Sequence, residues 1–236
     1  MPTNYRYINQ TTANGIELHI IKTDASNIMF RNFKLGQSLT DSIFFGVNGG
    51  FFSGSTALNI AKCDGVHYGR SNNGNLGGGI ICWNGTSLII YTNRSMTDID
   101  TIFKTNETGT WAQGGYSMWL GASDARERSL EEVHNDDKYG YLTNAASGRT
   151  ALVADLDTDT IYLIVTNDSN TFTTFRKAIQ YYFNIPETKP SSRYRGIMLD
   201  GSGSSQLRAK KSNGALVKVE GDGRELCQVI VMRDAT

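Results

Sequence analysis

"RTALVADLDTDTIYLIVT", residues 149–166, contains two apolar runs that are separated by a short polar segment. Short apolar runs bounded by polar turn residues are typical of β-strands. Asp157, Thr158 and Asp159 supply the turn between the two runs. The stretch therefore predicts an antiparallel hairpin, and a β-rich fold built around it.

The same pattern continues on both sides of this hairpin. In the stretch 78–92, two apolar runs meet at Asn84-Gly85, a dipeptide whose tolerance of positive φ suits a two-residue hairpin turn. The frequent glycines (25) and rare prolines (3) also indicate many turns between short strands. Further strands are predicted at 16–23, 42–48, 195–200, 215–220 and 227–232.

Helices are fewer than strands. The stretch 170–186 places its apolar residues on one helical face, with Asn170 or Thr171 as its cap and Pro186 after its end. A shorter helix is predicted at 97–104, and the charged segment 123–148 is expected to be a long excursion between strands. The predicted class is α+β, with a mainly antiparallel sheet and hairpins. The 236 residues fit one domain at 16–236, after an N-terminal extension at 1–15.

Composition excludes several classes of protein. Lys+Arg and Asp+Glu number 23 each, so the net charge is zero and no basic stripe favours nucleic acid. No apolar run approaches the ~20 residues of a membrane span, and the polar start lacks a signal pattern, so a cytoplasmic protein is expected. The three cysteines lack the spacing of a disulfide framework or a zinc site, and are expected to be buried in the core. The number of subunits cannot be inferred from the sequence.

Four stretches combine glycine with polar residues at the predicted ends of strands. They are "VNGGFF" (47–52), "AQGGYSM" (112–118), "SGRTAL" (147–152) and "LDGSGSSQL" (199–207). Each alone is most simply a turn. Together they indicate a site, because glycine exposes backbone N–H groups that suit anions.

In this order, the motifs NGGFF, QGG-x-x-M, R-T-A-L and LDG-x-G-S-S resemble those of the phosphodiester glycosidase family, which has many bacterial and phage members. The resemblance covers roughly residues 16–233 and includes a helix between the third and fourth motifs. Two features depart from the family pattern. Ser202 stands where glycine is usual, and "RELCQVIV" replaces an arginine-proline-valine signature, with Arg224 slightly early.

The resemblance implies a hydrolase that cleaves the glycosidic C–O bond of a sugar-1-phosphodiester, releasing free sugar and a phosphate monoester. Arg149 matches the family's arginine, and its planar fork would hold two phosphate oxygens. Asp200 would act as a nucleophile, as a base for water or as a stabiliser of positive charge on the sugar. Taken alone, Arg149 equally fits a surface residue or a core ion pair, and Asp200 equally fits the cap of a turn.

Other residues of the motifs are expected to shape this site. Asn48 is expected to act with Asp200 and Arg149 in catalysis, although an Asx turn would also explain it. The residues expected to bind substrate are Gly49, Gly50, Gln113, Gly114, Gly115, Thr150, Gly201, Ser204 and Ser205.

The leaving group explains why a second catalytic carboxylate is less necessary here. Ordinary glycosidases use two carboxylates, one of which protonates a poor leaving group. A phosphate monoester leaves more easily, since its second pKa is only ~6. Asp64 in "KCDG" is the candidate if a second carboxylate exists, but a turn explains it better. The residues require no cofactor, and the expected partner is a sugar phosphate or glycan.

Several other signals are explained without function. "DLDTDT" (155–160) lacks the later glycine and glutamate of a calcium loop, and "GNLGGG" (74–79) leads into a strand where a nucleotide-binding motif needs a helix. His19, His67 and His134 lack metal-site spacing. Two alternatives to the glycosidase remain: a phosphodiesterase that cuts P–O, and a non-catalytic glycan- or nucleotide-binding protein of a virus particle.

Overall fold

The computed structural model describes residues 4–69, 78–92, 94–103, 107–122 and 146–233. Sheet A has ten strands, β1–β2–β13–β12–β14–β11–β7–β8 in order, with β9 also paired to β11 and β10 paired to β9. Its strands are β1 (Tyr5–Thr11), β2 (Glu17–Asp24), β7 (Ala61–Cys63), β8 (Val66–His67), β9 (Gly78–Trp83), β10 (Leu88–Thr92), β11 (Trp111–Ser117), β12 (Ser147–Asp155), β13 (Thr160–Asn170) and β14 (Tyr194–Met198).

Sheet B has five strands in the order β16–β15–β4–β17–β3. They are β3 (Ile28–Asn32), β4 (Gly46–Asn48), β15 (Leu207–Lys210), β16 (Leu216–Val219) and β17 (Gln228–Met232). The remaining elements are the hairpin of β5 (Phe52–Ser53) and β6 (Thr56–Ala57), the helices α1 (Met96–Ile102) and α4 (Phe172–Phe183), and the 3-10 turns η1 (Ala25–Asn27) and η2 (Ser202–Ser204). Every pairing within the sheets is antiparallel, so the expected α+β class is confirmed.

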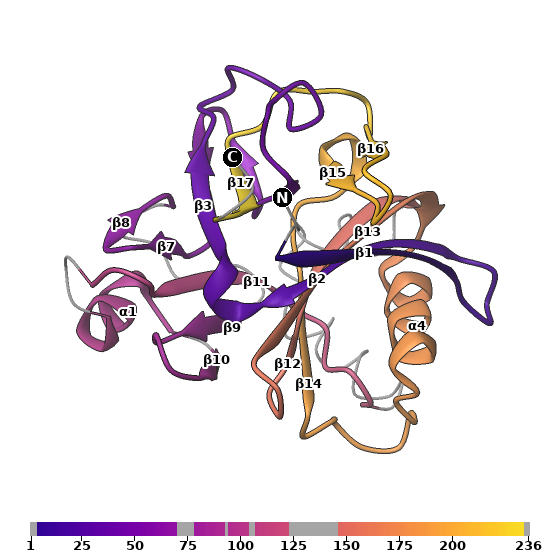
Figure 1. Ribbon diagram of the computed structural model, residues 1–236. Coiled ribbons are helices and arrows are strands. Elements are labelled where there is room, and N and C mark those ends of the chain that lie inside the picture. Colours follow the sequence, from indigo (N-terminus) through magenta and orange to yellow (C-terminus); the bar gives the residue numbers. More distant parts are fainter. Residues whose placement is uncertain (1–3, 70–77, 93, 104–106, 123–145, 234–236) are drawn as a thin grey trace.

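The alternation of side chains along the central strands builds three layers. On β12, Leu152 and Ala154 point into a core shared with sheet B, whereas Ala151 and Val153 point into a core covered by α4. Because both faces are covered there, the paired central segments 151–154 of β12 and 161–165 of β13 are apolar and buried. Figure 1 shows α4 running alongside β12, β13 and β14, and α1 on the far side beside β10.

Most of the expected elements are confirmed, including the central hairpin of β12 and β13 and the helices α1 and α4. Thr171 caps α4 through its hydroxyl group, and Asn184 ends the helix in the left-handed conformation. Cys63, Cys82 and Cys227 are buried and unpaired, as expected. Neither of the two described helices is long and apolar enough to cross a membrane.

Four details differ from the sequence-based expectations. Only 46–48 of the expected strand 42–48 is extended, since Ser42 donates a hydrogen bond to the Leu39 carbonyl in a turn. The 84–87 connection is longer than a two-residue turn, because the Asn84 side chain accepts hydrogen bonds from the N–H groups of Thr86 and Ser87. The segment 112–118 does not follow a strand but lies largely within β11.

The fourth difference concerns the ends of the predicted elements. Residues 5–11, placed in the expected extension, pair along β2 as strand β1. The division of the chain into 1–15 and 16–236 stays a prediction. Of the expected excursion at 123–148, residues 123–145 lie outside the described ranges, and β12 begins at Ser147.

Candidate functional site

The chain crosses from sheet A to sheet B through the turn at 199–206. β14 ends in sheet A at Met198, and β15 begins in sheet B at Leu207. The turn lies against the start of β12, since a Cβ at Gly148 would come within 3.2 Å of the Ser202 carbonyl oxygen and of Ser205 Oγ. Three of the four glycine motifs therefore meet at the seam between the two sheets.

Asn48, at the end of β4, joins these segments. Its amide nitrogen donates to the carbonyl oxygen of Asp200 at 2.8 Å. Its amide oxygen accepts from Thr150 Oγ1 at 2.7 Å and from the N–H of Gln206 at 3.1 Å. The N–H of Asp200 in turn donates to the Gly49 carbonyl. Asn48 is 1% exposed, so its amide holds the Asp200 turn in position from the protein interior.

The carboxyl group of Asp200 lies in an environment that favours its neutral form. Burial raises its pKa to about 6. Ser204, the N–H of Gly201 and the charge of Arg224 oppose this rise. Gly201 donates to Asp200 Oδ1 at 3.0 Å, whereas Ser204 Oγ has no hydrogen bond of ordinary geometry within the described residues. A carboxyl group with a pKa of about 6 exchanges its proton close to neutral pH, so it is suited to proton transfer or charge stabilisation.

Arg149 brings a buried positive charge to the same turn. Its side chain is 3% exposed, and burial lowers the pKa of its guanidinium. Its Nε donates to the carbonyl oxygen of Asn170 at 2.9 Å, which fixes the plane of the fork. A Cβ at Gly201 would lie 3.8 Å from Arg149 Nη1, so the guanidinium lies against the residue that follows Asp200. Such a fixed guanidinium fits a phosphate group.

Two serines of the turn carry hydroxyl groups whose bonding within the protein is incomplete. Ser204 and Ser205 are fully buried, and neither Oγ forms a hydrogen bond of ordinary geometry with a described residue, although Ser204 interacts with the Asp200 carboxyl group. A buried hydroxyl group without a partner is uncommon and calls for an explanation, such as a ligand. Next to this turn is an open cavity of about 290 Å³, lined by Ser147, Gly148, Asn167, Ser169, Ser202, Gly203, Gly221 and Asp222.

The side-chain amides of Gln228 and Gln113 form a chain of hydrogen bonds that holds the Gly49-Gly50 segment in place. Gln228 Oε1 accepts from the N–H of Gly50 at 3.0 Å, and Gln228 Nε2 donates to Gln113 Oε1 at 3.2 Å. A Cβ at Gly49 would come within 2.7 Å of the Gln228 carbonyl oxygen, so only glycine fits there. Gln113 is fully buried and also bonds to backbone carbonyls.

The structure therefore brings together most of the residues expected at the site. Strand β11 of sheet A contains Gln113, Gly114 and Gly115. A Cβ at Gly115 would meet the Met198 carbonyl oxygen at 2.6 Å, so this strand packs closely against the end of β14. Sequence reasoning missed Gln206 and Gln228 as positioning residues. A glutamine between cysteine and valine in the apolar run "CQVIVM" was the available signal, since a buried amide needs partners.

Ser202 has a positive φ, a backbone conformation that favours glycine. This explains why glycine is usual at this position in the family whose motifs the chain resembles. Its φ of 58° lies in the left-handed region, which costs about 1–2 kcal/mol for a residue with a Cβ. Ser202→Gly is expected to stabilise the protein by about 0.5–1 kcal/mol, because the greater freedom of unfolded glycine offsets part of the relief. Urea unfolding measures the change. Ser212→Gly, at an exposed turn serine without positive φ, is the control and should not stabilise.

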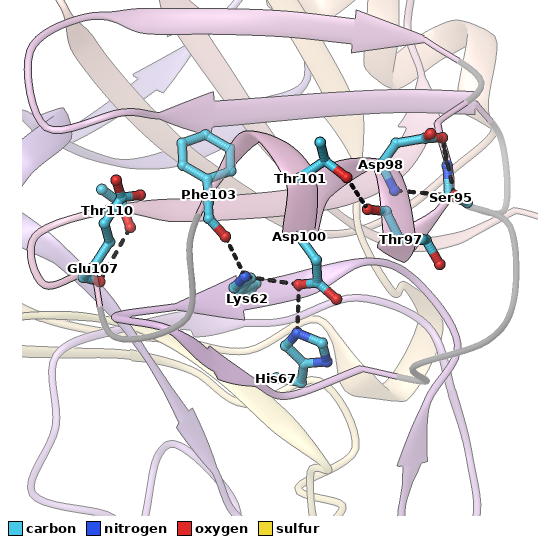
Figure 2. Close-up of polar contacts among 10 residues, drawn as sticks. All are labelled: Lys62, His67, Ser95, Thr97, Asp98, Asp100, Thr101, Phe103, Glu107 and Thr110. Carbon is cyan, nitrogen blue, oxygen red and sulfur yellow. Dashed lines mark hydrogen bonds and ion pairs between the residues drawn. The ribbon is translucent and has the colours of Figure 1, made fainter.

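A second polar cluster lies away from this turn, between β7, β8 and α1 (Figure 2). Lys62 Nζ donates to Asp100 Oδ1 at 2.7 Å and to the Phe103 carbonyl oxygen at 2.6 Å. His67 Nε2 also lies 2.7 Å from Asp100 Oδ1. Burial would raise the pKa of Asp100, but the hydrogen bonds from Lys62 and His67 outweigh it and lower that pKa. The hydrogen bond from Lys62 to the Phe103 carbonyl satisfies a backbone acceptor at the C-terminal end of α1.

The cluster leads to a prediction about stability. Asp100→Ala leaves the Lys62 ammonium buried without its carboxylate, and is expected to cost about 1–3 kcal/mol, since Asp100 is partly exposed. Lys62→Met replaces the buried charge by an apolar chain, and is expected to cost less than about 1 kcal/mol. Urea unfolding of both variants tests this order. An equal or larger loss in Lys62→Met would contradict it.

Comparisons with known proteins support the fold. No protein-family model matches the chain, and no curated protein sequence matches it. A solved structure of the zebrafish N-acetylglucosamine-1-phosphodiester alpha-N-acetylglucosaminidase catalytic domain, auto-inhibited by its pro-peptide, is similar with a TM-score of 0.66 and 14% identity. The match covers 99% of this chain and 83% of that one.

A hypothetical protein from Synechocystis is also similar, with a TM-score of 0.52 and 11% identity over 97% of this chain and 61% of that one. At these identities the likeness shows a shared fold. The chain therefore has a fold like that of a phosphodiester glycosidase domain.

Proposed function

We propose that the chain is a hydrolase that cleaves the glycosidic C–O bond of a sugar-1-phosphodiester. The observation that carries the proposal is the juxtaposition at the 199–206 turn. A carboxyl group with a raised pKa, a buried guanidinium and two buried hydroxyl groups lie at this one turn. The open cavity beside the turn is lined by residues adjacent to them in the chain, among them Gly148, Ser202 and Gly203. The likeness to a phosphodiester glycosidase domain supports the same reaction.

The proposed reaction divides the work between Asp200 and Arg149. Water adds to the anomeric carbon, the C–O bond breaks, and its electron pair leaves with the phosphate monoester. Asp200 acts at the sugar, as the base for water, as the nucleophile or as the stabiliser of positive charge. Arg149, Ser204 and Ser205 bind the phosphate, whose negative charge increases as the bond breaks.

Asn48, Gln206 and Gln228 act in this proposal as positioning residues. Their side-chain amides are occupied by backbone groups, including the Asp200 carbonyl, and in Gln228 also by the Gln113 side chain, so they hold the turn and the glycines. Thr150 supports Asn48 in the same way. Precise placement of the reacting groups is worth several kcal/mol to a catalyst.

Phosphorus NMR of the purified protein with a panel of sugar-1-phosphodiesters and nucleotide sugars tests the proposal. A phosphate monoester and free sugar are the expected products. Sugar 1-phosphate would show P–O cleavage, and binding without turnover would favour a non-catalytic module. Either of these results would overturn the proposed reaction.

A further inference from the structure

A cavity of about 210 Å³ lies near the opposite end of β14 from Asp200. Its walls come from β9, β10, β14 and the segment after β11, and they are mainly apolar, with contributions from Ile80, Ile81, Ile90, Leu120 and Ile197. Arg195, also in the wall, is five residues before Asp200, or about 16 Å of extended strand. The cavity is thus separate from the site proposed above.

Arg195 is unusual among the arginines around it. It is only partly exposed, and burial lowers the pKa of its guanidinium. Arg193, two residues earlier in the chain, forms a two-bond ion pair with Asp155, and the buried Arg176 donates to three backbone carbonyls. Arg195 forms no ion pair with any described residue, and donates only a long bond of 3.4 Å to the Tyr194 carbonyl. A partly buried cation that lacks an anion within the described ranges is costly there unless a ligand supplies one.

The wall opposite the strands is held in a strained conformation. Trp119 has a φ of 44°, which a bulky residue rarely adopts. Arg176 fixes this segment by donating to the carbonyl oxygens of Met118 at 2.6 Å and Trp119 at 2.7 Å. Strain that is maintained by surrounding contacts is a sign of a built site.

A second guanidinium lies near one residue of the cavity wall. The guanidinium of Arg94 lies 5.9 Å from the ring centre of Tyr91, which is part of the cavity wall. The Arg195 guanidinium in the wall of a mainly apolar cavity, with a second guanidinium near Tyr91, favours a ligand with one anionic end and one apolar end. A cavity of about 210 Å³ is large enough for a ligand body of several carbon atoms.

We propose that this cavity binds a small amphipathic anion, whose carboxylate or phosphate head pairs with Arg195 and whose short apolar body fills the chamber. The head would take the planar fork of the guanidinium. The body would pack on the isoleucines of β9, β10 and β14. This is a second site, independent of the proposed hydrolysis.

NMR titration of the intact chain with hexanoate, hexyl phosphate, hexanol and inorganic phosphate tests the proposal. Hexanoate or hexyl phosphate is expected to bind saturably, and the one that binds better identifies the head group. Hexanol and inorganic phosphate should each bind at least about tenfold more weakly, because each lacks one half of the ligand.

Three variants locate the binding. Arg195→Gln should weaken hexanoate at least about tenfold while leaving hexanol unchanged. Ile90→Trp should block the binding of hexanoate and of hexanol, because the larger side chain fills the cavity. Arg6→Gln replaces an exposed arginine of β1 and should change the binding of neither compound. Equal hexanoate binding by Arg195→Gln, binding that survives Ile90→Trp, or no saturable binding up to the solubility limit would overturn the proposal. Turnover of a sugar-1-phosphodiester is not needed for any of these results, so the two proposals fail separately.

Discussion

Asp200→Asn is expected to lower kcat/KM for a sugar-1-phosphodiester by about 10²–10⁴-fold, the usual contribution of a positioned acid or base. Asparagine keeps the oxygen that accepts the hydrogen bond from Gly201, so the turn should survive the change. Steady-state assays by phosphorus NMR measure the loss. Asp157→Asn removes an exposed carboxylate from the β12–β13 turn and serves as the matched control, with activity expected to be unchanged.

The pH dependence of the wild type gives an independent check. The pKa of Asp200 is raised to about 6 by burial, so its carboxylate form is lost as the pH falls below that value. If the ionised form acts at the sugar, kcat/KM should fall about tenfold per pH unit below pH 6. The residual activity of Asp200→Asn should not show this fall in kcat/KM below pH 6. A wild-type profile that stays flat down to pH 4.5 would contradict the assignment.

The same group should also weaken the fold at neutral pH. A carboxyl group whose folded pKa is raised contributes stability that is fully present below its unfolded pKa, near 4, and that is lost as the pH rises through about 6. Asp200→Asn removes the buried charge, and is expected to stabilise the protein at pH 7 by on the order of 2 kcal/mol. Little difference is expected at pH 4. A destabilised variant at pH 7 would contradict the raised pKa and indicate that the ionised carboxylate stabilises the fold.

How much of this architecture can be predicted from the sequence depends on the range of the interactions. The hairpin of β12 and β13 and the helix α4 follow from local periodicity and turn residues, and both are where the pattern places them. Strand β11 was missed because its glycine pair suggests a turn, whereas the glycines allow β14 to pack closely against it. Local pattern does not contain that information.

The site itself depends on contacts between distant parts of the chain. Asn48 and Asp200 are separated by 152 residues, and Gln228 and Gln113 by 115. Spacing along the chain could not have paired them. The resemblance in motif order suggested only that Asn48 and Asp200 meet, and it did not indicate Gln228. The proposed distinction between Asn48 as a positioning residue and Asp200 as a reacting group rests on burial and hydrogen-bond geometry, which the sequence does not contain.

Arg149→Gln is expected to lower kcat for a sugar-1-phosphodiester by about 10²–10³-fold, comparable to the removal of one donor from a site of developing charge. Arg149→Lys should fall between the wild type and Arg149→Gln, because it keeps the charge but loses the fork. Both variants lose the bond to the Asn170 carbonyl, which is expected to cost about 1–2 kcal/mol of stability. Thermal unfolding therefore establishes the folded fraction before rates are compared.

A substrate without phosphate separates catalysis from structure. With an aryl glycoside of the same sugar, no phosphate charge develops at Arg149, so any turnover of that substrate should fall by less than about tenfold in Arg149→Gln. The ratio of the two losses measures what the guanidinium contributes to the leaving phosphate. If both substrates lose activity equally in the folded variant, Arg149 serves only to hold β12 against the Asp200 turn, and the phosphate must be bound by the hydroxyl and N–H groups of that turn.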